Sequence, residues 1–125
     1  MATERNLVNT NYHKLFARIA AREALRVLPI FEKERPKDFR PRKALEAITA
    51  WAKGKRTLGM KIVRKLSLDS HAAARACRSD AARFAARAAG QAVAVWHVPT
   101  HAMAVPMYVQ KAVSANEKAK RMKND

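Results

Sequence analysis

The sequence contains few of the residues that build disulfides, loops or aromatic cores. It has one cysteine, Cys77, three glycines and only 6 % aromatic residues, whereas 49 % of the chain is hydrophobic. A single cysteine excludes an internal disulfide and a paired-cysteine metal site, and it suits a reducing, cytoplasmic compartment. Three scattered glycines exclude a glycine-rich phosphate loop. The most common small residue is alanine, which favours closely approaching helices over stacked sheets.

Acidic residues are also scarce. The 125 residues include 26 Lys and Arg but only 10 Asp and Glu, which gives a formal net charge of +16. The imbalance is greatest over residues 53–90, which hold ten basic and two acidic residues. Such a field attracts nucleic acids, acidic proteins and anionic membranes alike, so charge alone does not identify a partner.

Charge is absent altogether from residues 88–110. This stretch of 23 residues contains Pro99, Pro106, His97 and His101, so we do not expect it to span a membrane. We expect instead a helix, a proline corner and a second helix, packed inside one small domain that needs no disulfides. The N-terminus is polar and has no signal-peptide pattern, which also predicts a cytoplasmic protein.

The spacing of apolar residues predicts an all-α fold, a helical bundle of about five helices in a single domain over residues 1–125. The helices are expected at residues 12–28, at 41–52, from 58 onwards, at 81–98 and at 100–116. A polar lead-in is expected at residues 1–11 and a basic tail at residues 117–125. Thr10 or Asn11 is expected to cap the first helix, Thr57 the third and Ser79 the fourth.

The boundaries of the second and third helices are marked by prolines, a glycine and a possible break. Pro29, Pro36 and Pro41 predict a turn or short helix followed by a loop between residues 28 and 42, with Pro41 in the first turn of the second helix. Gly54 is expected to end that second helix. The third helix either continues to Arg78 or breaks at residues 67–69 and restarts.

The proline corner carries the most distinctive side chains. His97 and His101 have the i, i+4 spacing of a metal-binding helix, but Pro99 between them disfavours a continuous helix, and a metal would need a third ligand such as His71. We favour structural histidines that join helix ends by hydrogen bonds. An anion or partner contact and a metal site remain as alternatives.

A second group lies on the third helical segment. His71 and Arg75 are one turn apart, with Arg64 and Arg78 near the same side of the helix, so they could donate hydrogen bonds to a carboxylate or phosphate. A solvated basic face explains the same pattern. No nucleophile motif or carboxylate pair is evident, so we expect neither an enzyme nor a cofactor.

The chain resembles the Imm-five-like family of putative immunity proteins over about residues 25–113. The resemblance is carried by Arg-Pro-Arg-Lys-Ala-Leu-Glu-Ala at residues 40–47, Ala-Trp-Ala at 50–52, His-Ala-Ala-Ala-Arg at 71–75, and residues 88–94 leading to the His-Val-Pro-Thr-His corner at 97–101. It implies a small α-helical cytoplasmic protein that neutralises a toxin by binding it. The residues that it implies for binding, and which we expect to converge, are Arg40, Arg42, Glu46, Trp51, His71, Arg75, His97 and His101.

Three functions follow, in order of preference. The first is a non-catalytic protein-binding domain, an immunity protein whose toxin has an acidic or apolar surface, because the excess of Lys and Arg disfavours a basic partner. The alternative is a basic protein that binds DNA or RNA with little sequence preference. The third is a metal-binding protein that uses His71, His97 and His101. A homodimer through residues 103–108 is a further prediction.

Overall fold

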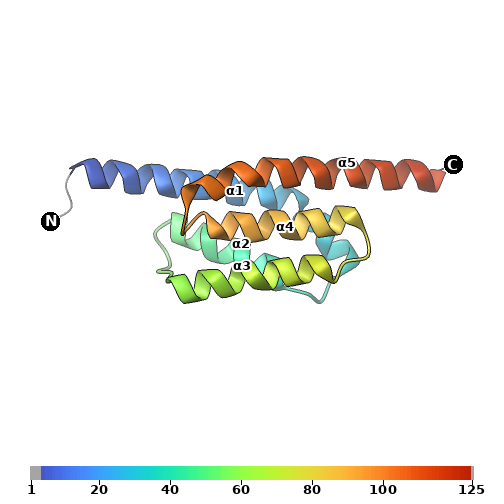
Figure 1. Cartoon of the computed structure of the whole chain (residues 1–125), viewed down its shortest axis with the longest axis horizontal. Helices are drawn as coiled ribbons and strands as arrows, with labels where there is room; N and C mark the ends of the chain where they lie inside the picture. Colours follow the sequence, from blue (N-terminus) through green and yellow to red (C-terminus); the bar gives the residue numbers. More distant parts are fainter. Residues whose placement is uncertain (1–3, 125) are drawn as a thin grey trace.

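The computed structural model describes residues 4–124, and these residues form five α-helices and one short 3₁₀ helix with no strand among them (Figure 1). The predicted all-α bundle is therefore confirmed. The elements are α1 (Glu4–Glu34), α2 (Arg40–Ala52), α3 (Met60–Arg75), α4 (Asp80–Ala94), η1 (Pro99–Met103) and α5 (Ala104–Asn124).

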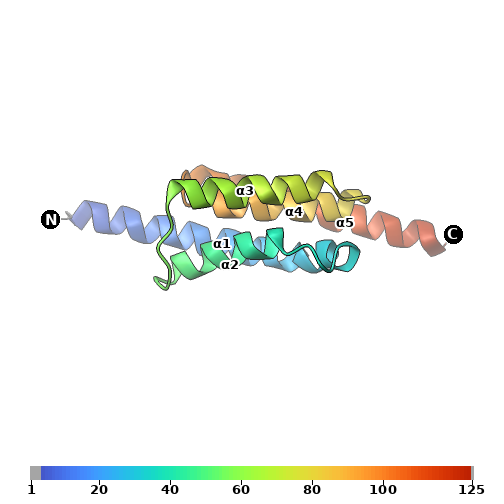
Figure 2. The same ribbon diagram turned by 90° about the horizontal axis from the view of Figure 1, so that it is seen from below.

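Helix α4 is the centre of the bundle. It contacts each of the other four helices and η1, with α1 and α5 on one side and α2 and α3 on the other (Figures 1 and 2). Seven of its nine buried residues are alanines. Because alanine side chains are short, several helix backbones can approach α4 closely without leaving voids.

The larger core side chains come from the helices around α4. Phe31 and Leu28 of α1 and Leu45 and Ile48 of α2 are almost completely shielded from solvent. Burying a side chain of this size contributes roughly 1.5–3 kcal/mol. The N-terminal part of α1 and the C-terminal part of α5 extend beyond this core at opposite ends of the molecule (Figures 1 and 2).

The first helix is longer than predicted. Thr10 and Asn11 lie inside α1 and do not cap it, and α1 continues through Pro29 to Glu34, so the predicted end of the first helix near Leu28 is wrong. The helix persists because Leu28 and Phe31, on either side of Pro29, are buried in the core, and their burial offsets the cost of a proline in a helix. The connection to α2 is confined to residues 35–39.

The middle helices follow the predictions more closely. Pro41 lies in the first turn of α2, and Gly54, just after that helix, has the positive φ of 74° that favours glycine. Helix α3 runs unbroken through residues 67–69, but its cap residue is Gly59 and not Thr57. The Ser79 side chain accepts a hydrogen bond from the Ala82 N–H at 3.1 Å, which confirms the predicted cap of α4.

The C-terminal third differs in two ways. Helix α4 ends at Ala94, earlier than the predicted residue 98. The last helix is present as α5, but it begins at Ala104 after the η1 corner and continues past the predicted residue 116 to Asn124. The predicted basic tail is helical as far as residue 124, and the predicted lead-in is helical from residue 4; residues 1–3 and 125 lie outside the described part of the chain. None of the described helices combines the length and apolar character needed to cross a membrane.

Candidate functional site

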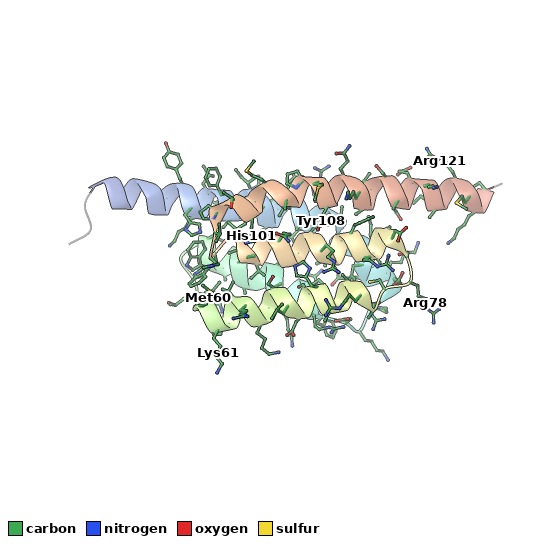
Figure 3. The ribbon with its side chains drawn as sticks, viewed as in Figure 1. Met60, Lys61, Arg78, His101, Tyr108 and Arg121 are labelled. Carbon is green, nitrogen blue, oxygen red and sulfur yellow. The ribbon has the colours of Figure 1, made fainter. Side chains whose placement is uncertain are left out.

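A groove of about 400 Å³ lies where α3 passes the C-terminal end of α4 and the η1 corner. Its lining is contributed by Met60, Val63, Arg64, Ser67, Leu68, Ala94, His97 and His101. Met60 and His101 lie at the same end of the bundle, and Arg78 lies at the other (Figure 3). The groove therefore combines an apolar lining with a basic side chain and the two corner histidines.

The corner histidines are held differently. The Nδ1 atom of His101 lies 2.8 Å from Oε1 of Gln91, and because an amide oxygen accepts, the histidine is the donor. This bond ties η1 to the last turns of α4. His97 is exposed at the groove and makes no such tie among the described hydrogen bonds, so its ring is available to a partner.

His71 lies one turn beyond Ser67 on α3 and packs directly over Gly90 of α4. A methyl group added at Gly90 would lie 2.7 Å from Nε2 of His71, and Ser67 donates a hydrogen bond to the Gly90 carbonyl at 3.0 Å. Arg87 Nη1 lies 2.8 Å from His71 Nδ1. Burial, and then the positive charges of Arg87, Arg75 and His101, lower the pKa of His71 below its usual value. The ring is therefore a neutral acceptor for the Arg87 guanidinium.

Metal binding by these histidines finds no support in the geometry. Among residues whose side chains are described, no three His, Cys, Asp or Glu side chains are placed to hold one ion. His71 lies near Arg87 and Arg75 as well as His101, and His101 is bonded to Gln91, so arginines and an amide stand where further metal ligands would be needed.

Trp51 lies at the same end of the bundle through a different contact. It is half buried, and its ring meets His13 edge-on at 5.1 Å between centroids, with Lys14 Nζ 5.5 Å from the ring centre. His13 Nε2 donates to the Val95 carbonyl at 2.6 Å. His13, packed against Trp51, thus fixes the chain at Val95, directly after the last residue of α4.

Arg40, Arg42 and Glu46 lie elsewhere. Arg40 forms two hydrogen bonds with Asp38, of 2.9 and 2.7 Å, and this side-chain contact lowers the pKa of Asp38 to about 2. Arg42 makes a bidentate pair with Glu32, both contacts at 2.6 Å. Glu46 is exposed beside a separate hollow between α1 and α2. Arg40 joins α2 to the loop before it and Arg42 joins α2 to α1, and none of the three residues lines the groove.

The eight residues singled out from the sequence are thus divided. His97 and His101 line the groove, and His71 and Arg75 follow it along α3. Trp51 lies outside the groove and contacts His13. The sequence did not predict the remaining residues of the site. These are the groove residues Met60 and Leu68 and the hydrogen-bonding residues His13, Arg87 and Gln91. Met60 and Leu68, apolar residues eight positions apart on α3, could have indicated an apolar surface on one side of that helix. No local pattern in the sequence pointed to His13.

The chain matches one known protein family over nearly its whole length. Residues 6–125 match the family described as Imm-5 like putative immunity protein. The chain belongs to that family. No curated protein and no solved structure matches it, so the placement of the site rests on the geometry described above.

A second exposed surface lies on the N-terminal half of α1. Tyr12, Leu15, Phe16 and Ile19 are all exposed and have the i, i+3, i+4, i+7 spacing of one helical face. The buried residues of the same helix, beginning with Ala17, occupy a different face. Met103 of η1 and Met107 of α5 are also exposed. The homodimer predicted through residues 103–108 stays a prediction.

Proposed function

We propose that this member of the family is a non-catalytic binding protein that neutralises a toxin, and that the groove between α3 and the η1 corner is its contact surface. The observation that supports this most directly is the lining of the groove. Exposed apolar side chains are costly to keep in water, yet Met60 and Leu68 are 45 % and 57 % exposed, side by side with Arg64 and His97.

The partner that fits this surface carries apolar side chains flanked by acidic ones. Interfaces commonly place an apolar centre inside a polar, charged rim, and the rim charges steer association. Here the rim is mainly basic: Lys61, Arg64 and Lys65 lie beside Met60 and Leu68 on the exposed face of α3. The one carboxylate among them, Asp69, pairs with Lys65. A complementary surface would be acidic and would be guided by the positive field of the whole chain.

The test uses, as the toxin candidate, a protein encoded by a gene beside the one for this chain. Cells that express that protein alone should stop growing, and co-expression of the wild-type chain should restore growth. Met60→Glu places a carboxylate in the apolar groove and repels an acidic partner, so we expect it to lose protection and at least about tenfold in affinity.

The matched control is Met122→Glu. Met122 is 68 % exposed near the C-terminal end of α5 and lies outside the groove, so the same substitution there adds the same negative charge. Protection should survive in this variant. Equal loss of protection in both variants would contradict the groove as the contact surface, and binding of the toxin candidate without protection would contradict neutralisation.

A further inference from the structure

The described side chains, residues 11–124, include five arginines that are partly buried: Arg35, Arg40, Arg42, Arg83 and Arg87. Four of them contact a carboxylate. Arg35 and Arg40 pair with Asp38, Arg42 with Glu32 and Arg83 with Asp80, at distances from 2.6 to 3.4 Å. Arg87 differs, since its side-chain partner within this part of the chain is the imidazole of His71.

The contact with His71 does not neutralise Arg87. A guanidinium stays protonated and can only donate, so Nη1 donates to Nδ1 of a neutral ring. Arg75 lies close enough to act on the same ring, and it too forms no ion pair within residues 11–124. Partly buried charges are normally paired, because burial without a counter-charge is costly.

The two helices that carry these arginines have no acid to spare. The acid on α3 is Asp69, which already pairs with Lys65 at 2.8 Å. The acid on α4 is Asp80, which already pairs with Arg83 at 2.6 Å. A carboxylate partner for Arg87 and Arg75 would therefore have to come from outside this pair of helices.

We propose that Arg87 and Arg75 bind a carboxylate of the protein partner, with His71 holding the Arg87 guanidinium in place. This inference rests on the proposed function and adds a second, polar contact to the apolar one. The site continues the groove, because His71 follows the groove residue Ser67 by one turn of α3, and Arg87 precedes the groove residue Ala94 by two turns of α4. A planar guanidinium fork matches a carboxylate bidentately.

A protein carboxylate fits better than a nucleic-acid phosphate. Arg87 and His71 are half buried, and exposed Leu68 lies one turn before His71 on α3, which suits an acidic side chain with an apolar neighbour. A nucleic-acid backbone presents regularly spaced phosphates and is bound mainly by exposed basic side chains. Arg87 is not such a side chain.

The test uses the full chain and two defined probes, a short oligoglutamate peptide and a single-stranded RNA of similar charge. Side-chain NMR signals of Arg87 and the ring carbons of His71 report binding at this site. We expect oligoglutamate to shift the Arg87 Nε–H signal and to raise the pKa of His71, because a bound carboxylate favours the protonated ring. Arg87→Gln should weaken oligoglutamate binding about tenfold.

Arg121→Gln is the matched control, since Arg121 is exposed on the distant end of α5 (Figure 3) and the substitution removes the same charge. It should weaken binding less than about twofold. Arg75→Gln, at an exposed position, serves as a second test variant in case Arg87→Gln fails to fold.

Equal weakening of oligoglutamate binding by Arg75→Gln and Arg121→Gln would overturn the proposed site and assign the binding to the overall positive charge. Shifts of Arg87 by RNA and not by oligoglutamate would overturn the carboxylate assignment. Neither probe involves a toxin, so this result is independent of the neutralisation assay.

Discussion

The geometry of the site depends on the close approach of the His71 side chain on α3 to Gly90 on α4. His71 can lie against α4 because residue 90 has no side chain, and this position lets Nδ1 meet Arg87. The sequence predicts that His71 and Arg75 share a face of a helix, because that spacing is local. It does not predict that Arg87 faces them, since the alignment of α3 with α4 depends on packing at Gly90.

Gly90→Ala tests this close approach. The added methyl group would displace the His71 ring, and overpacking of this kind costs about 1–3 kcal/mol, partly offset by the better helix propensity of alanine. We expect a net loss of about 1–2 kcal/mol in the free energy of unfolding, measured with urea. Gly59→Ala is the control, because nothing lies within 4 Å of its added methyl group, so it carries only the cost of alanine at a helix N-cap, about 0.5–1 kcal/mol. Equal stability of the two variants would contradict the packing of His71 on Gly90.

The lowered pKa of His71 predicts a pH dependence. Burial and the facing charges of Arg87, Arg75 and His101 disfavour the protonated ring in the folded state, so the unfolded chain binds the proton more tightly. The stability that this provides is complete above the unfolded pKa of about 6.5 and is lost as the pH falls from there toward the lower folded value. Urea unfolding of wild type and His71→Asn between about pH 7.5 and 5 measures it. A wild-type slope that is identical in the variant would refute this assignment.

Among the helices, agreement with the sequence depends on whether local signals or tertiary burial decide the boundary. The Ser79 cap, Pro41 in the first turn of α2 and Gly54 after that helix are local signals, and the structure follows them. Pro29 is a local signal that the structure overrides, since Phe31 is completely buried only if α1 continues past it. Helix α4 ends at Ala94, and Pro99 begins the 3₁₀ corner, where a proline at the first helical position costs no hydrogen bond.

Because α1 stays helical through Pro29, replacing this proline should stabilise the protein. Pro29 is exposed inside α1 and lacks the N–H that would bond to a carbonyl one turn earlier. Pro29→Ala restores that donor and improves helix propensity, while it increases the entropy of the unfolded chain. We expect a net gain of about 1–2 kcal/mol by urea unfolding, with Pro36→Ala in the loop as the control. A loss of stability in Pro29→Ala would show that the bundle requires the proline geometry.

Considered as a whole molecule, the protein is a strongly basic bundle whose described acids mostly serve internal contacts. Asp38, Glu32, Asp69 and Asp80 all pair with arginine or lysine inside the chain. The charge excess is therefore left on the surface, as the composition predicts. The sequence predicts the sign of the partner's charge from this excess, but the groove depends on how α3 and η1 meet, which no local pattern specifies.

The most direct test of the groove as the contact surface is hydrogen exchange of the full chain with and without the toxin candidate from the neighbouring gene. The account predicts slower exchange of backbone amides in α3 from residue 60 to 71 and around the η1 corner, with α1 unchanged at residues 12–19. Protection confined to residues 12–19 would contradict it and would assign the interface to the exposed apolar face of α1.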